Sequence, residues 1–320
     1  MHIVIIGGTG HVGTYLVPRL VEAGHSLTVI TRGQRKPYSP HGAWNSVRLM
    51  SLDRAAEEQV GTFGSKIRNL QPDAVIDMIC FTEESARHLV DALRGQVQHF
   101  LHCSSVWVHG YTTQIPVSED APRRPIGDYG TRKAAIEAYL LGEARHSGFP
   151  TACILPGHIV GPGWVPLNPV GNFNPEVYAR LGCGDEVILP NQGTEVVHHV
   201  HADDVAQLFV KVLTHWNVAI GESFHAVSPA ALTLRGYAEA VAGWFGQPAR
   251  LKFLPFEAWK NTVSPEDAEA TLGHLEHSPN CYSITKAQRL LDYQPRYSSL
   301  EAIDESVQAL VTSGQIKVYS

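Results

Sequence analysis

A strand that runs directly into a glycine-rich turn near the N-terminus constrains the fold of this chain more than any other feature. The apolar run His2–Ile6 is typical of a buried parallel strand, and residues 14–23 have the spacing of an amphipathic helix. Gly7, Gly10 and Gly13 allow a sharp turn and a close approach of the backbone to a ligand. The helix start also offers unpaired N–H groups and a positive dipole end. The sequence therefore predicts a phosphate-binding turn, and the alternative is a βα turn whose glycines serve packing alone.

The composition narrows the class of protein. The chain has 320 residues, a net charge of −6 and five scattered cysteines with no Cys-x-x-Cys pair. A mildly acidic chain of average apolar content is typical of globular proteins and argues against nucleic-acid binding by bulk charge. The first expected strand begins at residue 2, and no apolar run approaches the length of a membrane span. We expect a cytoplasmic protein with reduced thiols and without membrane or nucleic-acid partners.

Strand-like and helix-like runs alternate through the first half of the chain. Strands are expected at 2–6, 26–31, 47–51, 74–79, 99–104 and 151–155, and helices at 14–23, 54–69, 83–93 and 129–147. This repetition predicts an α/β fold with a doubly wound parallel sheet.

A run rich in glycine and proline follows residue 157 and predicts a departure into a second, smaller lobe. Beyond it, helices are expected at 201–216, 233–246, 285–291 and 300–313, a strand at 223–227, and an irregular segment at 259–280. The predicted nucleotide-binding domain is 1–160 plus about 197–228, and the predicted C-terminal substrate lobe is about 161–196 and 229–320.

A tyrosine and a lysine open the long expected helix at 129–147. Tyr129 and Lys133 are four residues apart and therefore share a helical face. A nearby ammonium favours the phenolate and lowers the pKa of a tyrosine, which suits it to exchange a proton with a hydroxyl oxygen. Ser105 follows an expected strand at the carboxyl edge of the sheet and could hold the same oxygen.

The order of these motifs resembles the extended short-chain dehydrogenase/reductase superfamily, in particular its NAD(P)-dependent epimerase/dehydratase family. Four further segments are similar to family signatures over nearly the whole chain: Pro156-Gly157-His158-Ile159-Val160-Gly161-Pro162-Gly163, His201-Ala202-Asp203-Asp204-Val205-Ala206, Lys286-Ala287-Gln288-Arg289-Leu290-Leu291, and Pro295 with Ser299-Leu300-Glu301.

The resemblance implies a Rossmann sheet, a nicotinamide cofactor and a small-molecule substrate, and it leaves a homodimer open. It implies a catalytic set of Ser105, Tyr129 and Lys133. The cofactor-binding residues that it implies are Gly7, Thr9, Gly10, His11, Val12, Gly13, Arg32, Asp53, Ile79 and Pro156. The predicted substrate-binding residues are Ser104, Trp107, His158, Asn168, Asn172 and His199.

The end of the second strand bears on the choice of cofactor. An acid at this point selects NAD through the ribose hydroxyls, whereas this chain has Thr31-Arg32-Gly33. The Arg32 guanidinium suits a phosphate monoester. We therefore expect NADP to be preferred over NAD, and the alternative is that Arg32 is an exposed loop charge.

The substrate lobe departs from the pattern of family members that use nucleotide diphosphate sugars. Those members carry an arginine where this chain has Val197, and residues 272–282 contain no second arginine. Without these donors a diphosphate would lose charge-assisted contacts. The histidines His198, His199 and His201 alternate faces in a strand and lack a partner carboxylate, so no metal site is predicted.

The predicted function is epimerisation or oxidoreduction at a hydroxyl or carbonyl carbon of a sugar or sugar-like substrate, with NADP as cofactor and Ser105, Tyr129 and Lys133 as the catalytic set. One alternative is an NADPH-dependent carbonyl reductase or dehydrogenase with net turnover. The second alternative is a regulatory or RNA-associated epimerase-like protein that binds the cofactor without turnover.

Overall fold

The computed structural model describes residues 1–318 and has a seven-stranded parallel sheet as its main element. The strand order is β11-β6-β5-β4-β1-β2-β3, which confirms the predicted doubly wound Rossmann sheet. The sheet strands are β1 (His2–Ile6), β2 (Ser26–Thr31), β3 (Arg48–Ser51), β4 (Ala74–Asp77), β5 (His99–Cys103), β6 (Thr151–Pro156) and β11 (Ser223–Ala226).

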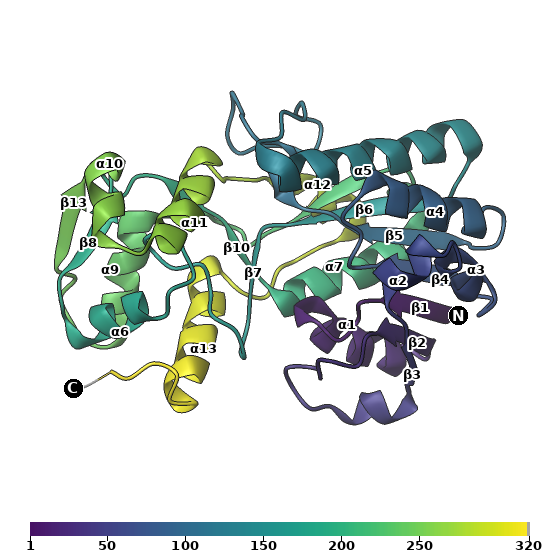
Figure 1. Cartoon of the computed structure of the whole chain (residues 1–320), viewed down its shortest axis with the longest axis horizontal. Helices are drawn as coiled ribbons and strands as arrows, with labels where there is room; N and C mark the ends of the chain where they lie inside the picture. The colour runs from purple at the N-terminus through teal and green to yellow at the C-terminus, as the bar shows by residue number, and fades with distance from the viewer. Residues whose placement is uncertain (319–320) are drawn as a thin grey trace.

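The order of the strands reverses next to β1 and so positions the ligand-binding edge. β1 pairs with β2 on one side and with β4 on the other, all in parallel. The connections from these two neighbours leave in opposite directions, so a crevice opens at the carboxyl ends of β1 and β4. Ile3–Ile6 are fully buried because both faces of the sheet are covered by helices (Figure 1).

Helices cover both faces of the sheet and fill the second lobe. Those of the first lobe are α1 (His11–Glu22), α2 (Arg54–Gln59), α3 (Phe63–Arg68), α4 (Glu83–Leu93), α5 (Gly127–Ser147), α7 (Ala202–Thr214), α8 (Trp216–Ala219) and α12 (Thr285–Leu291). Those of the second lobe are α6 (Glu176–Cys183), α9 (Leu234–Trp244), α10 (Phe256–Trp259), α11 (Pro265–Glu276) and α13 (Ser299–Thr312). Short 3₁₀ turns lie at η1 (Gly42–Ser46), η2 (Val106–Val108) and η3 (Lys260–Thr262).

Pairs of short strands build the second lobe and the connection to it. They are β7 (His158–Val160) with β10 (His199–His201), β8 (Val187–Pro190) with β13 (Leu251–Leu254), and β9 (Val196–Val197) with β12 (Leu232–Thr233). Figure 1 shows the purple and teal sheet elements on one side and the green and yellow lobe on the other, with β7 and β10 between them.

Two hydrophobic cores follow this division and correct one predicted boundary. The first core holds the sheet and its helices, and the second holds α6, α9 and α13 with their strands. Buried residues of segment 282–293, among them Tyr282, Ala287 and Leu291, belong to the first core. Their segment was assigned to the substrate lobe, yet α12 packs its apolar face against β11 and α7.

Two expected elements differ from the structure. The helix expected at 54–69 is interrupted, because Gly61 adopts a φ of +71° after α2 has ended. The segment 259–280 was expected to be irregular, but Ser264 caps α11 by accepting a hydrogen bond from the Asp267 N–H, and Pro265 is its first residue. Within residues 1–318, no helix has both the length and the apolarity to cross a membrane.

Candidate active site

The glycine turn after β1 has the geometry that a close approach of a ligand requires. Gly7 has a φ of +84°, and a Cβ atom on Gly13 would lie only 1.9 Å from the carbonyl oxygen of Gly8. Any larger residue at position 13 would force α1 away from the turn. The helix N-terminus is therefore held against the end of β1, where its free N–H groups can face a phosphate.

A cavity of about 450 Å³ opens beside this turn, at the carboxyl ends of β1 and β2. The cofactor-binding residues from the sequence analysis that line it are Gly7, Thr9, Gly10, Arg32, Asp53 and Ile79. Asp53 caps α2 by accepting a hydrogen bond from the Ala56 N–H at 3.2 Å. A cavity of this size, with a glycine turn on one wall and cationic side chains on another, fits part of a dinucleotide.

The remaining predicted cofactor residues, His11, Val12, Gly13 and Pro156, do not line this cavity. Val12 is buried in the first core, and Pro156 is the buried last residue of β6. The His11 ring instead stacks on Trp164 at a centroid distance of 3.6 Å. Trp164 comes from the loop that leads into the second lobe, so the His11 side chain contacts that loop.

Arg54 is a residue of this cavity that sequence reasoning missed. Its guanidinium lies 2.8 and 2.9 Å from the two carboxylate oxygens of Asp77 and 2.7 Å from Glu58. Only 9% of the Arg54 side chain is exposed, so this pair is buried under the cavity floor. It ties the end of β4 to α2 and thereby fixes the position of Asp53. The signal in the sequence was an arginine directly after the helix cap.

The catalytic residues predicted from the sequence come together at the adjoining carboxyl edge. Ser105 follows β5, and its hydroxyl accepts a hydrogen bond from the Trp107 N–H at 3.2 Å. Tyr129 lies in the first turn of α5, and its hydroxyl interacts with Ser105. The two elements approach closely because residue 130 is glycine, where a Cβ would lie 2.8 Å from the Trp107 carbonyl oxygen.

Lys133 lies one turn further along α5 and is almost fully buried. Its ammonium donates to the carbonyl oxygens of Cys80 and Cys103, at 2.8 and 2.9 Å. Cys80 follows β4, and Cys103 is the last residue of β5. The Nζ atom is 5.9 Å from the centroid of the Tyr129 ring. Desolvation lowers the pKa of Lys133.

The electrostatics of Tyr129 correct the predicted direction of its pKa. Desolvation raises the pKa of Tyr129 to about 12, with the nearby Cys103 thiol adding to the shift and Ser105 opposing it. Sequence reasoning expected Lys133 to lower this pKa, but the ammonium points at two backbone carbonyls. The phenol is therefore in its protonated form at neutral pH.

The substrate-side predictions divide into two groups. Ser104, Trp107, His158 and His199 lie near the catalytic edge: Ser104 precedes Ser105 directly, and the Trp107 ring contacts the Tyr129 ring at 5.9 Å between centroids. The His158 ring lies 6.3 Å from Trp107, and the His199 ring lies 5.6 Å from His158.

Asn168 and Asn172 are not available to a substrate, contrary to the prediction. Both are buried, and the Asn168 side chain donates to the Asn172 side chain at 2.6 Å. The side-chain Oδ1 atom of Asn168 accepts from two backbone N–H groups, and the Asn172 side chain donates to the Thr271 hydroxyl on α11. Their amide groups are consumed in fixing the loop of the second lobe to that helix.

Two further histidines from α11 and the residue after it complete the surroundings of Trp107. The His277 ring stacks on Trp107 at 3.9 Å, and the His274 ring lies 5.3 Å from it. Neither histidine was among the predicted substrate-binding residues. The spacing of three residues between the two histidines was the signal that they share a helical face.

Val197 stands where family members that use nucleotide diphosphate sugars carry an arginine, and its surroundings are apolar. Val197 belongs to β9, pairs with Leu232 of β12 and is 2% exposed within the second core. Among residues 1–318, no group of three or more His, Cys, Asp or Glu is arranged to hold a metal ion.

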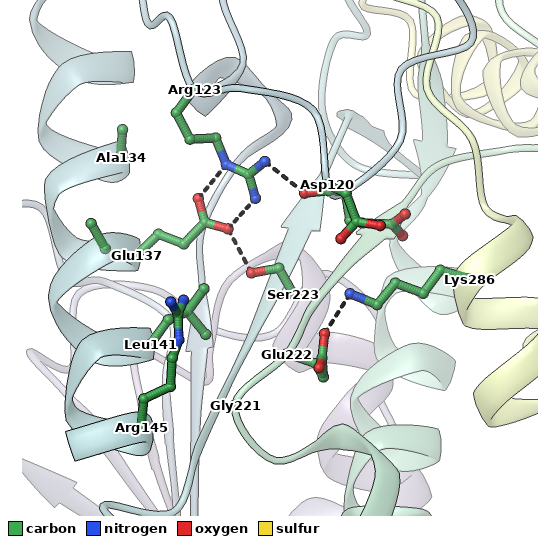
Figure 2. Close-up of a pocket in the computed structure, with 12 residues that line it drawn as sticks. Asp120, Arg123, Ala134, Glu137, Leu141, Arg145, Gly221, Glu222, Ser223 and Lys286 are labelled. Carbon is green, nitrogen blue, oxygen red and sulfur yellow. Dashed lines mark hydrogen bonds and ion pairs between the residues drawn. The ribbon is translucent and has the colours of Figure 1, made fainter. Parts of the chain in front are cut away.

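A second cavity, of about 370 Å³, lies between α5 and the edge strand β11 (Figure 2). Four of its charged groups form two ion pairs. Arg123 contacts both carboxylate oxygens of Glu137 at 2.7 and 2.9 Å, and the Ser223 hydroxyl donates to the same carboxylate. Lys286 and Glu222 form another pair at 2.6 Å. Because these pairs already satisfy one another, and no predicted catalytic residue lines this cavity, the candidate active site is the edge with Tyr129.

Comparison with known proteins agrees with this geometry. A family model described as "NAD dependent epimerase/dehydratase family" matches residues 3–225. The chain is 28% identical to 2'-dehydrokanamycin reductase of Streptomyces kanamyceticus, over 84% of this chain and 73% of that protein. It is 25% identical to the chloroplast stem-loop binding protein of 41 kDa b of Arabidopsis thaliana, over 95% of this chain and 78% of that protein.

A solved structure shows the same fold. The chain matches the crystal structure of UDP-glucose 4-epimerase with UDP-glucose from Thermotoga maritima with a TM-score of 0.74 and 19% identity, covering 98% of this chain and 99% of that one.

Proposed function

The chain belongs to the NAD-dependent epimerase/dehydratase family, of the extended short-chain dehydrogenase/reductase type, and we propose that it oxidises or reduces a hydroxyl-bearing carbon of a sugar-like substrate without a nucleotide. One observation carries the proposal: Ser105, Tyr129 and Lys133 lie together at the carboxyl edge of the sheet, next to the cavity of the glycine turn.

In this proposal Tyr129 is the proton donor and acceptor. A dinucleotide cofactor held by the residues of the glycine-turn cavity would donate or accept the hydride. The protonated phenol, with its pKa of about 12, can donate to the oxygen of a carbonyl substrate, while the Ser105 hydroxyl holds that oxygen in line. The reverse direction needs the phenolate. The Lys133 ammonium, 5.9 Å from the centre of the Tyr129 ring, would attract that negative charge once it forms, although it does not lower the pKa of the phenol in the unliganded site.

The cofactor preference in this proposal is for NADP. The end of β2 carries no acid, and the Arg32 and Arg35 side chains line the cavity there. Guanidinium groups suit the 2'-phosphate that distinguishes NADP from NAD, whereas an acid would repel it.

Epimerisation by transient oxidation is the first candidate reaction and net reduction is the second. One observation favours net reduction, which is the similarity to a protein named as a reductase. Consumption of NADPH in proportion to product would identify net reduction, whereas an epimerase would interconvert two sugars at a catalytic amount of cofactor.

Binding of RNA, which the name of the Arabidopsis relative indicates for that protein, is not part of this proposal. A net charge of −6 opposes contact with a phosphate backbone.

Product analysis tests the proposed reaction. The purified protein is incubated with NADP(H) and a panel of free, phosphorylated and nucleotide-linked sugars. Tyr129→Phe should lower turnover by about 100-fold or more and leave cofactor binding intact. Tyr139→Phe, on the same helix, is the matched control and should keep full activity. Undiminished turnover in Tyr129→Phe would remove this residue from proton transfer.

Competition by free UDP tests the proposal that the substrate carries no nucleotide. Val197 is buried in an apolar core, so UDP should inhibit only weakly. Inhibition at micromolar UDP would contradict the proposal and favour a nucleotide sugar.

A further inference from the structure

The side chains around Trp107 form a compact group beside the proposed proton donor. Its members, which we call the histidine cluster, are Trp107, His158, His199, His274 and His277. The His277 ring stacks on Trp107 at 3.9 Å with an interplanar angle of 15°, and Trp107 meets the Tyr129 ring at 5.9 Å. The histidine cluster therefore contacts the side chain of Tyr129, the proposed proton donor, through the Trp107 ring.

Backbone carbonyls fix the tautomers of three of these histidines. The Nδ1 atom of His277 lies 2.7 Å from a carbonyl oxygen one turn earlier in the chain. The Nδ1 atom of His158 lies 3.3 Å from the His198 carbonyl oxygen. The Nε2 atom of His199 lies 3.1 Å from that of Leu167. A carbonyl oxygen can only accept, so each facing nitrogen carries the proton.

The opposite nitrogen of each ring then carries a lone pair and can accept a hydrogen bond. Desolvation lowers the pKa of His277, holds that of His158 well below 6.5 and lowers that of His199 to about 3. All three rings are therefore neutral at pH 7, with a single N–H each. The free acceptors are His277 Nε2, His158 Nε2 and His199 Nδ1.

These three acceptors are buried and have no hydrogen-bond partner among residues 1–318. The Ser104 hydroxyl, which directly precedes Ser105, is a fourth buried group without a partner in the described chain. Leaving a buried polar atom unpaired is costly, and native structures avoid it unless a ligand or water completes the bond. Four such atoms near one catalytic edge indicate a site built for a ligand.

The character of the site follows from the direction of these bonds. Three lone pairs attract groups that donate hydrogen bonds, and they repel a carboxylate or phosphate, which at neutral pH offers acceptors only. An ammonium group would gain further from the aromatic ring of Phe173, which is 51% exposed and 5.7 Å from the His274 ring.

We propose that the histidine cluster is a hydrogen-bond-accepting subsite that selects a sugar presenting hydroxyl or amino groups and rejects its carboxylate or phosphate counterpart. This inference rests on the proposed function for the location of the reacting carbon. It adds the chemistry of the substrate beyond that carbon, which the catalytic residues leave open.

The test is a titration of the NADP-loaded protein, labelled with ¹⁵N in histidine, with glucosamine, glucose and glucuronate. Glucosamine and glucose should shift the unprotonated nitrogen signals of His277 and His158, and glucuronate should bind at least about tenfold more weakly. His277→Phe keeps the stacked ring and removes the acceptor, so it should reduce this discrimination several-fold and assign the His277 signal.

His99→Phe is the matched control. His99 also packs on a tryptophan, Trp216, at 4.5 Å, and its Nδ1 atom is likewise buried without a partner in the described chain, but it lies at the first residue of β5, away from the catalytic edge. Its replacement should leave the discrimination unchanged. Equal binding of glucuronate, binding of none of the three sugars, or a wild-type ratio in His277→Phe would each overturn the proposal.

The same titration with Tyr129→Phe, together with the turnover of this variant in the product analysis, separates the two proposals. If this variant stays active while the discrimination holds, the proton-transfer role is wrong and the subsite stands. If it is inactive while the wild type fails to discriminate, the subsite is wrong and the proposed reaction stands.

Discussion

A buried pair of histidines makes the stability of this protein sensitive to mild acid. His109 and His225 are both fully buried, and their Nε2 atoms are 2.8 Å apart. The His225 Nδ1 atom donates to the Ser283 carbonyl oxygen, so its Nε2 atom accepts from His109. Desolvation is the main cause that lowers the pKa of His109 to about 2 and that of His225 to about 3.

The sign and size of the effect follow from proton linkage. Each histidine has a pKa near 6.5 when unfolded, so below pH 6.5 the unfolded chain binds a proton that the folded chain does not, and stability falls as the pH falls. Each contributes about 1.36 kcal/mol per pH unit, which is about 2 kcal/mol at pH 5 and about 4 kcal/mol for the pair. Glu119, whose carboxylate accepts from the His225 N–H, has a raised pKa and offsets part of this loss.

Urea denaturation at pH 7.5, 6.0 and 5.0 measures the effect. The free energy of unfolding should fall steeply below pH 6.5 in the wild type. The double variant His109→Phe/His225→Phe should lose about 2.7 kcal/mol per pH unit of that slope, since two titrating groups are removed. His146→Ala, at the exposed end of α5, should retain the wild-type slope. An unchanged slope in the double variant would refute the linkage argument, whatever its stability at pH 7.5.

Three further changes test the cofactor and catalytic sites. Gly13→Ala should weaken NADP binding at least about tenfold in calorimetric titration, because its Cβ would lie 1.9 Å from the Gly8 carbonyl oxygen; Gly142→Ala, with open space around it, is the control and should bind normally. Arg32→Ala should narrow the difference in affinity between NADP and NAD by about tenfold, and a wild type that binds NAD at least as tightly would contradict the NADP assignment. Lys133→Met should lower turnover more than it lowers NADP affinity, because it removes the cation near the phenol; equal losses in both would instead indicate a general collapse of the edge.

The sheet and the catalytic edge could be predicted because short segments determine them. The alternation of apolar runs and the glycine spacing at residues 7, 10 and 13 act within one βα unit, and Tyr129 and Lys133 share a helical face through their spacing alone. Gly61 shows the limit of such reasoning, because its left-handed conformation divides an otherwise continuous helical pattern.

Contacts between distant segments explain the predictions that failed. Asn168 and Asn172 have the composition of a sugar-binding loop, but their amides are consumed by one another and by Thr271, about a hundred residues later. The stacking partner of His11, Trp164, likewise belongs to another lobe and could not be found from the residues around His11. In each case the sequence shows the polar or aromatic character of the side chain. The partner of the side chain lies far away in the sequence, so a local pattern cannot predict it.

The histidine cluster shows why the chemistry of a site can be hidden even when its residues are visible. A histidine offers a donor and an acceptor in the sequence, and only the group that faces one nitrogen decides what the other presents. For His277 that group is the Gly273 carbonyl of α11, the helix that His277 follows, which an i−4 spacing could have indicated. For His199 it is the carbonyl of Leu167, on a loop that sequence reasoning treated as irregular. The acceptor character of the site is thus set by backbone oxygens, so replacing a neighbouring side chain should leave it intact, whereas moving the loop at Leu167 should change it.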